Sequence, residues 1–559
     1  MKIIKVSDYL VSSLKKCGID TYFGVQGGAI AHVIESSAKY CDYFPVLNEQ
    51  AAGLYAHGYY YNHKKAAAVL TTTGPGFLNS ITGMGACYYD NVPSVFITGQ
   101  VSKNLNLAKK FGIKMYGFQE VQHMDIGKNI SDNYFKIDSD KSLLKFISFL
   151  EKNNLTIKKT IFIEIQDEFS RSFIKFKKLK KHKIKNQKIK KNQIQKFYKE
   201  ILSSKKPLIL AGNGFSDIKS GKLLINKFSK KMKIPIAFSW GGSTIMDNKN
   251  EFNKGYFGLH SPGVANLMIQ DSDLLICFGI SLLQHQAGKN KLFFSPSAKI
   301  LYVNNCLNNN KRIKYDFNNR VKNFNFDTVN FLKNINIFKI KKKLNKFNVI
   351  ENKKNYNFKN RSKPVEIIKN ILEKFNKKNK QNIIFSDAGA TLSWSYQAAN
   401  ILKQKNLITS FNIHTMGYSI CAGIGAAIKS NTKVLSIIGD GSVLMNSQEL
   451  INYCRVKKNL KILVFDNKGY GIIRQTQDDF FKSNYIGTKI GFKNNIPPYN
   501  ISEIIKSFGL KSKTLNENLS NSDISNFINS ELDCLIININ IKYKVDHISL
   551  TNKMHYLPF

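Results

Sequence analysis

Two apolar runs, each followed or ended by an oxygen-bearing side chain, constrain the fold of this chain more than any other feature. Asp440 follows the run 434–438 within Gly-Asp-Gly-Ser, and Asn467 ends the run 462–467. Residues 446–454 between them have the pattern of a helix. The unit predicts two parallel strands joined by a helical crossover, and open α/β sheets bind ligands at the carboxyl ends of such strands.

The residue types at these two strand ends suit a magnesium ion that carries a diphosphate. Mg²⁺ takes about six oxygens, usually one or two carboxylates with phosphate oxygens and water. The Asp440 carboxylate, the Asn467 amide and the Gly469 carbonyl would supply the protein ligands. Gly441 would let the backbone approach the phosphate, and Ser442 would add donors at a helix start. Gly-Asp-Gly alone could be an ordinary bend, but the spaced Asn-Lys-Gly-Tyr-Gly turn favours the metal site.

The charge balance invites a macromolecular partner, yet its distribution argues against one. Lys and Arg number 84 against 38 Asp and Glu, a formal charge of +46 that would suit a polyanion. The excess is lysine, spread with asparagine and isoleucine over every segment, and no basic motif is interleaved with aromatic residues. We therefore predict no nucleic-acid partner.

The terminus and the cysteines indicate the compartment. The first residues lack the apolar stretch of a signal peptide, and no run approaches the ~20 apolar residues of a membrane helix. Eight cysteines are scattered without CxxC spacing, which is typical of free thiols in a reducing compartment. We expect a cytoplasmic protein with no membrane partner.

Two lysine- and asparagine-rich stretches, 175–196 and 338–363, have the composition of exposed connectors. They predict three domains, with limits at 1–174, 190–337 and 364–545. The first two blocks contain strand-like apolar runs at 66–70, 94–97, 207–212 and 274–279. The pattern predicts an α/β protein of three domains with mostly parallel sheets.

Further motifs occur in a fixed order along the chain. They are Phe-Gly-Val-Gln-Gly-Gly at 23–28, Asn-Glu-Gln-Ala-Ala at 48–52, Thr-Thr-Gly-Pro-Gly at 72–76, Val-Phe-Ile-Thr-Gly-Gln at 95–100, Gly-Phe-Gln-Glu at 117–120 and His-Thr-Met-Gly at 414–417. With the unit at 439–469, this order resembles thiamine diphosphate (ThDP) enzymes, and acetolactate synthase large subunits in particular. The resemblance covers nearly the whole chain. It implies a pyrimidine-binding domain, a central domain and a diphosphate-binding domain.

The resemblance gives Glu49 the main catalytic role. The matching glutamate in the family hydrogen-bonds a pyrimidine ring nitrogen of ThDP and promotes removal of a proton from the cofactor. The role needs a carboxyl group in a mostly apolar site, and apolar residues flank Glu49 at 44–47 and 51–52. A surface glutamate favoured by a helix dipole is the alternative.

Other cofactor and active-site residues follow from the same resemblance. Met416 matches the bulky apolar residue that holds the cofactor bent, and the His414 carbonyl would meet its amino group, although the family has glycine there. Phe118 and Gln119 match an active-site pair, one a wall and the other a hydrogen-bond donor. The loop near the pyrimidine would contain Thr73, Gly74 and Asn79.

The substrate end departs from acetolactate synthase. Thr476 stands where that family has a tryptophan that favours the larger acceptor, a change worth on the order of 1–3 kcal/mol of discrimination. Ser281 and His285 occupy two positions that hold arginines in the family, so the carboxylate clamp is absent there. The same changes put FAD binding, which those enzymes show in the central domain, in doubt.

These observations predict a ThDP- and Mg²⁺-dependent enzyme that decarboxylates a 2-oxo acid, with pyruvate the first candidate, and joins the product to a carbonyl acceptor. True acetolactate synthase and a simple decarboxylase are the alternatives within the class. A non-catalytic basic binding protein is the alternative outside it, and the retained Glu49, Asp440 and Asn467 argue against that. The family's shared sites imply a homodimer or homotetramer.

Overall fold

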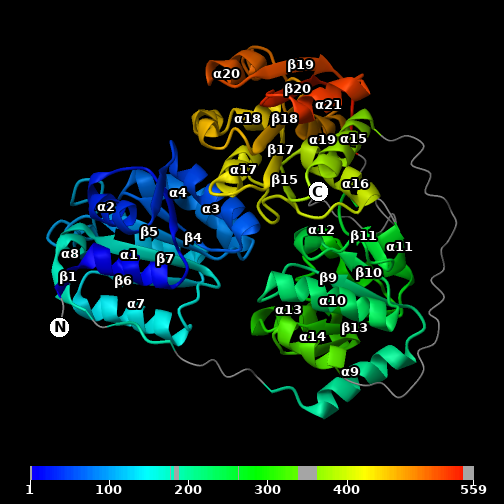
Figure 1. The fold of residues 1–559 in the computed structure, drawn as a ribbon, viewed down its shortest axis with the longest axis horizontal. Helices are drawn as coiled ribbons and strands as arrows, with labels where there is room; N and C mark the ends of the chain where they lie inside the picture. The colour runs from blue at the N-terminus through cyan, green and yellow to red at the C-terminus, as the bar shows by residue number, and fades with distance from the viewer. Residues whose placement is uncertain (1–2, 177, 182–187, 262–263, 338–361, 546–559) are drawn as a thin grey trace.

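The chain forms three α/β lobes, each built on its own six-stranded sheet (Figure 1). The computed structural model describes residues 3–176, 178–181, 188–261, 264–337 and 362–545. Within each of the three sheets every neighbouring pair of strands is parallel. The expected fold class is therefore confirmed. The predicted domain limits themselves remain predictions.

The first lobe, blue to cyan in Figure 1, has the strand order β3-β2-β4-β5-β7-β6. Its strands are β2 Thr21–Gly24, β3 Asp42–Pro45, β4 Ala67–Thr71, β5 Ser94–Gln100, β6 Asn133–Ile137 and β7 Thr160–Gln166. A small antiparallel pair, β1 Ile3–Lys5 with β8 Phe173–Lys175, lies beside it. Its helices are α1 Val6–Lys16, α2 Ala31–Tyr40, α3 Glu49–His63, α4 Pro75–Tyr89, α5 Ala108–Phe111, α6 His123–Gly127, α7 Asp140–Lys152 and α8 Asp167–Arg171.

The central lobe, in green, has the strand order β11-β10-β9-β12-β13-β14. Its strands are β9 Pro207–Ala211, β10 Ile236–Phe238, β11 Asn253–Tyr256, β12 Leu274–Phe278, β13 Lys299–Val303 and β14 Val321–Phe324. Its helices are α9 Lys191–Ser203, α10 Ile218–Met232, α11 Val264–Asp271, α12 Gln284–Ala287, α13 Leu307–Phe317 and α14 Thr328–Ile337. Strands β9 and β12 are buried along their whole length, as continuous apolar runs covered by helices on both faces should be.

The third lobe, yellow to red, has the strand order β16-β15-β17-β18-β20-β19. Its strands are β15 Asn382–Ser386, β16 Leu407–Ile408, β17 Lys433–Gly439, β18 Leu460–Asp466, β19 Ser512–Asn516 and β20 Cys534–Asn538. Its helices are α15 Lys363–Lys378, α16 Ala390–Leu402, α17 Tyr418–Ala427, α18 Asp440–Val443, α19 Gly471–Phe480, α20 Ile501–Ser507 and α21 Asn521–Asn529. The predicted strand pair around residues 434–467 is β17 and β18, side by side at the middle of the sheet.

Two local expectations need correction. The segment between β17 and β18 is not an α-helix over 446–454: it is the short α18 followed by a 3₁₀ helix, η6 Ser447–Arg455. The connector expected over 175–196 ends earlier, because α9 begins at Lys191 and buries Ile194. The second connector lies outside the described residues up to position 361. Among the helices that the structure describes, none is long and apolar enough to cross a membrane.

Helices α3 and α17 join the first lobe to the third. Gly58 faces the Ala422 carbonyl so closely that a Cβ at 58 would lie 1.9 Å from its oxygen. The carboxylate of Glu449 on η6 ties the two lobes again, accepting from the Leu47 amide at 2.9 Å and from the Tyr55 hydroxyl at 2.7 Å. Backbone contact between helices and buried hydrogen bonds together fix how these two lobes meet.

Candidate active site

The carboxyl edge of the third sheet brings the predicted metal ligands together. β17 and β18 pair in parallel up to Gly439 and Phe465, so the residues after them, Asp440 and Asn467, emerge at the same edge. Asp440 is buried, and its Oδ2 accepts from the Gly469 amide at 2.9 Å and from the Tyr499 hydroxyl at 2.6 Å. Gly469 is thus held against Asp440, as the proposed ligand set requires.

The Asn467 side chain indicates that this edge can hold a cation. Its amide oxygen faces two other oxygens, and the reversed amide would instead donate to the Gly469 carbonyl at 2.7 Å and to Asp440 Oδ1 at 3.2 Å. The reversed amide satisfies both oxygens by donating to them, whereas with its own oxygen turned toward them the same side chain would bind a cation together with them. Oxygens at neighbouring corners of a magnesium octahedron lie about 2.9 Å apart, which matches this spacing. The residues present therefore fit Mg²⁺.

Neighbouring residues determine the pKa of Asp440 and the space around its backbone. Burial, with a further contribution from nearby Asp466, raises the pKa of Asp440 above its ordinary value. A bound cation would reverse that effect by favouring the carboxylate. Gly441 leaves room for the ring of Tyr470, because a Cβ at 441 would lie 2.4 Å from it. Within the described residues no three His, Cys, Asp or Glu side chains converge, so amide and carbonyl oxygens must complete any metal shell.

Asp387, which was not predicted from the sequence, anchors the predicted cofactor loop. Asp387 directly follows β15 and is fully buried. Its carboxylate accepts from the backbone amides of Gly417 at 3.0 Å and Ser419 at 2.7 Å, at the start of α17 directly after Met416. It also hydrogen-bonds Ser442, and burial raises its pKa to about 6. Asp387 therefore links the loop of His414 and Met416 to the sheet edge that carries Asp440 and Ser442.

His414 lies in a buried aromatic cluster at the border with the central lobe. Its backbone has a φ of +49°, and its Nδ1 is buried without a hydrogen-bond partner. The ring meets Trp240 edge to face at 5.9 Å, and Trp240 stacks on His285 at 5.5 Å. Burial lowers the pKa of His414. The side chain therefore points into the central-lobe border as a neutral ring, which leaves the backbone carbonyl for another partner.

In the first lobe, Glu49 opens helix α3. Asn48 caps the helix, its side chain accepting from the Gln50 amide at 2.8 Å. The Glu49 side chain is largely buried, and Asn79 donates to its Oε2 at 3.1 Å. Glu49 Oε1 would lie 3.4 Å from a Cβ at Gly76, so the 72–76 loop passes directly over the carboxylate. The helix-start position and the buried setting are both present.

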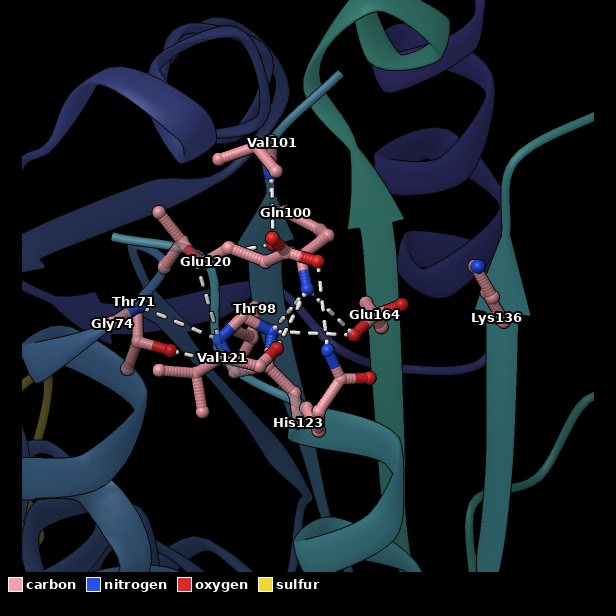
Figure 2. A network of polar contacts seen from close by, with 12 residues as sticks. Thr71, Gly74, Thr98, Gln100, Val101, Glu120, Val121, His123, Lys136 and Glu164 are labelled. Atoms are coloured by element: carbon pink, nitrogen blue, oxygen red, sulfur yellow. Dashed lines mark hydrogen bonds and ion pairs between the residues drawn. The ribbon is translucent and has the colours of Figure 1, made fainter. Parts of the chain in front are cut away.

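The predicted loop residues Thr73 and Gly74 lie in one polar network with the predicted active-site residue Gln119. Figure 2 shows the part of this network around Gly74 and His123. The Thr73 hydroxyl donates to the Gln119 carbonyl at 2.8 Å. Phe118 is different: its side chain is 82% exposed, so within a single chain it forms no wall. Phe118 can line an active site only if another protein surface packs against it.

The residues of the predicted site form two clusters, one in the first lobe and one in the third. Asp440, Asn467 and Gly469 lie together with the Asp387-anchored loop, whereas Glu49, Asn79 and the 72–76 loop lie together in the first lobe. The two lobes are joined by the contact between α3 and α17 and by the Leu47 amide, two residues before Glu49, which donates to Glu449.

The positions that depart from acetolactate synthase carry no free cation. The Ser281 carbonyl accepts from Arg312, whose guanidinium also pairs with Asp316. Burial, together with His414 and Lys291 nearby, lowers the pKa of His285 to about 3, so this ring is neutral at pH 7. Thr476 donates to the Ile472 carbonyl at 3.3 Å and leaves no large apolar surface at that helix position.

Comparisons with known proteins agree with this geometry. Three family models match: "Thiamine pyrophosphate enzyme, N-terminal TPP binding domain" over 4–126, "central domain" over 194–322 and "C-terminal TPP binding domain" over 387–532. Together they cover more than half of the chain.

Similar curated proteins are acetolactate synthase large subunits. The chain is 26% identical over 501 residues to a probable one from Methanocaldococcus jannaschii, covering 86% of this chain and 83% of that protein. It is 24% identical over 497 residues to the isozyme 2 large subunit of Escherichia coli, covering 87% of each. It is 25% identical over 539 residues to that of Buchnera aphidicola subsp. Schizaphis graminum, covering 92% and 91%. The chain therefore belongs to the thiamine pyrophosphate enzyme family, as a ThDP-dependent, acetolactate synthase-like enzyme.

Proposed function

We propose that this enzyme decarboxylates a 2-oxo acid, with pyruvate as the leading donor, and transfers the resulting two-carbon unit to a carbonyl acceptor. The observation that carries the proposal is the convergence of Asp440, Asn467 and Gly469 oxygens at one sheet edge, in a chain whose other half-site retains Glu49. A degenerate scaffold would have no reason to keep both. We place the enzyme in the cytoplasm, acting on small molecules without a nucleic-acid or membrane partner.

The cofactor would be held from its two ends. Asp440, Asn467 and the Gly469 carbonyl would bind Mg²⁺ and through it the diphosphate, with Gly441 and Ser442 beside the phosphates. Met416 and the His414 carbonyl would meet the pyrimidine side, on a loop whose position Asp387 fixes. When bound, ThDP supplies the carbanion chemistry that lets a 2-oxo acid lose CO₂.

Glu49 would hold and exchange a proton with a pyrimidine ring nitrogen. The carboxylate is largely buried, and Asn79 orients one of its oxygens, so the other oxygen is available for the ring. Thr73 and Gly74 would pack beside the pyrimidine, and Gln119 would donate to the reacting substrate. In this proposal Glu49 alone transfers a proton, and the other residues position the cofactor and the substrate.

The acceptor side of the site that we propose lacks the indole and the two arginines of acetolactate synthase. Thr476 replaces a large indole, and Ser281 and His285 replace two arginines, with His285 neutral at pH 7. Such a site would accept an aldehyde or a hydroxylated ketone more readily than a second 2-oxo acid, whose carboxylate needs a cation. Authentic acetolactate synthase, suggested by the names of the relatives, and a simple decarboxylase are the competing activities.

Product analysis separates these activities. Purified enzyme with ThDP, Mg²⁺ and pyruvate is assayed alone and with a panel of ketones, aldehydes and sugars. We expect pyruvate loss to accelerate with one carbonyl acceptor and a carboligated product to form. Acetolactate from pyruvate alone would favour the synthase, free acetaldehyde would favour the decarboxylase, and no consumption under any condition would refute the proposal. Tight DNA binding that falls steeply with salt would instead favour the binding-protein reading.

We propose a homodimer, or a homotetramer built from it, as the active unit. The predicted site is divided between the first and third lobes, and Phe118, with Phe111, Ile113 and Met115 before it, leaves an apolar surface exposed that a second chain would cover. Mixing Glu49→Gln chains with Asp440→Ala chains should restore activity, because one site of each mixed dimer carries neither change. Demonstrated subunit exchange without recovered activity would place the site within one chain.

A further inference from the structure

A buried carboxylate–imidazole pair lies directly behind the 72–76 loop, and the proposed mechanism does not use it. His123, at the start of α6, is fully buried, and Glu164 on β7 is 3% exposed. His123 Nδ1 lies 3.2 Å from Glu164 Oε2 (Figure 2). Gln100 bridges the same two groups, its Nε2 donating to Glu164 Oε2 at 3.2 Å. Burying a carboxylate costs free energy unless hydrogen bonds compensate it, and His123 and Gln100 supply those hydrogen bonds.

The contacts of the ring define its tautomer. An ionised carboxylate accepts only, so the contact with Glu164 requires a proton on Nδ1. On the other side of the ring, the Gly74 amide donates to Nε2 at 3.4 Å, so Nε2 must carry a lone pair. The Thr73 hydroxyl also lies 3.4 Å from Nε2. Gln100 Nε2 also lies 3.2 Å from Nδ1, but its two hydrogens are donated to the Val121 carbonyl at 2.9 Å and to Glu164 Oε2 at 3.2 Å, so this contact requires no lone pair on Nδ1. These contacts together give a neutral imidazole with its proton on Nδ1.

His123 supports the Thr73–Gly74 turn, and this turn holds the backbone of Gln119. Gln119 has a φ of +60°, a left-handed conformation that a non-glycine residue holds only when its surroundings impose it. The Thr73 hydroxyl donates to its carbonyl at 2.8 Å. Gly74, with φ +64°, approaches so closely that a Cβ there would lie 2.9 Å from the Gln119 Cβ. The strained residue therefore rests on the Thr73–Gly74 turn.

The next residue holds the chain from the opposite side. The Glu120 carboxylate, 1% exposed, accepts from the backbone amides of Ala108 at 3.0 Å, Tyr116 at 2.9 Å and Gly117 at 3.1 Å. Gln119 is thus fixed between a carboxylate that orders the preceding loop and a turn backed by the imidazole. Such a frame determines where the Gln119 amide can point.

We propose that His123, kept in its Nδ1–H tautomer by Glu164, is a positioning residue that sets the orientation of Gln119 through the Thr73–Gly74 turn. The inference rests on the proposed function in that Gln119 is taken to meet the substrate. His123 itself meets neither substrate nor cofactor: its neighbours are Thr73, Gly74, Gln100, Glu164 and the ring of Phe77 at 4.8 Å. Glu164 keeps the ring proton of His123 on Nδ1, and Nε2 can then accept from the Gly74 amide.

Glu164→Leu is the sharpest perturbation, because it removes the acceptor beside Nδ1 and leaves that nitrogen facing the Gln100 Nε2 donor at 3.2 Å. The ring proton then moves to Nε2 and opposes the Gly74 amide. We expect ¹⁵N NMR of the holoenzyme to show the reversed tautomer for the resonance that His123→Gln removes. We also expect faster hydrogen exchange in peptides covering 72–76 and 117–121, and kcat/KM for the donor acid lowered by about 10- to 100-fold.

Double variants distinguish positioning from general loss of stability. If His123 acts through Gln119, adding Glu164→Leu to Gln119→Ala should lower kcat/KM no more than about threefold further. His123→Gln, whose Oε1 can still accept from the Gly74 amide, should retain more activity than His123→Leu. His57 and Asp90 form a matched control pair, buried with Nε2 3.0 Å from Oδ2. Because this control pair does not act through Gln119, the double variant His57→Gln/Gln119→Ala should have its kcat/KM lowered by the product of the two single effects.

Two results would overturn the inference: an Nε2–H or doubly protonated His123 in the wild-type holoenzyme, or multiplicative effects of Glu164→Leu and Gln119→Ala. Failure of the proposed function is a separate outcome. An enzyme that consumes no 2-oxo acid would refute that proposal, while the tautomer and the exchange rates of the two loops would still decide whether the pair positions Gln119.

Discussion

The first and third lobes meet where α3 and α17 cross, and Gly58 sets how closely the helices approach. An alanine Cβ at this position would lie 1.9 Å from the Ala422 carbonyl oxygen. Because the obstacle is backbone, no side chain can turn away, and the helices must separate by about 1.5 Å to reach ordinary contact. Gly58→Ala should therefore destabilise the enzyme although alanine favours helices.

The magnitude follows from two opposing effects. Overpacking of this kind costs about 1–3 kcal/mol, towards the upper end where backbone must move. The better helix propensity of alanine returns up to ~1 kcal/mol. The net loss of about 2 kcal/mol corresponds to a fall in melting temperature of roughly 4–8 °C for domains of this size.

Gly85 in α4 supplies the matched control for that substitution. It is also a buried glycine in a helix of the first lobe, but an added Cβ would meet only Ile413 Cδ1 at an ordinary 3.8 Å. Gly85→Ala should leave the melting temperature unchanged or slightly raised. Differential scanning fluorimetry of both variants decides the matter. If Gly58→Ala melts as high as Gly85→Ala, the close contact of α3 with α17 does not constrain the fold as argued.

Three further outcomes are expected. Asp440→Ala should weaken Mg²⁺ and ThDP together, with only partial rescue by added Mg²⁺, and unchanged affinity in titration calorimetry would refute the metal assignment. The purified enzyme should show little or no flavin absorbance, because Ser281 and His285 replace two arginines, and one tightly bound FAD per chain would contradict this. The folded-state pKa of Asp387, about 6, lies above its ordinary 3.8, so this group contributes stability at low pH that is lost as pH rises from about 4 to 6. The melting-temperature deficit of Asp387→Asn should therefore be larger at pH 5 than at pH 7, and an equal deficit would refute that shift.

Local patterns were sufficient for the ligand edge of the third lobe. An apolar run that ends at a polar residue marks the end of a buried strand, and two such strands in a crossover unit meet at one edge. Asp440 and Asn467 could be placed in this way. The same rule would have found Asp387, which also follows a buried apolar strand, β15, next to β17. The 3₁₀ geometry of η6 could not be read, because over nine residues its spacing hardly differs from that of an α-helix.

Contacts between segments that are far apart along the chain could not be predicted from the sequence. Glu449 binds Leu47 and Tyr55 about 400 residues away, and no local signal indicates such partners. The His123–Glu164 pair is of the same kind, although a glutamate inside the otherwise apolar strand β7 was a usable hint. The exposure of Phe118 depends on which surfaces a single chain leaves uncovered. Residue roles in catalysis came from the family resemblance rather than from local pattern.

Decarboxylation by the wild type and by Glu49→Gln tests the central claim most directly. CO₂ release from carboxyl-labelled pyruvate, with ThDP and Mg²⁺ present, is measured for both proteins alongside ThDP binding by calorimetry. The account predicts release by the wild type, and for Glu49→Gln nearly unchanged ThDP binding with release reduced by at least about 100-fold, because the amide keeps the shape of the carboxyl group but cannot hold the proton. Full activity in Glu49→Gln, or no release by the wild type with any 2-oxo acid, would contradict it.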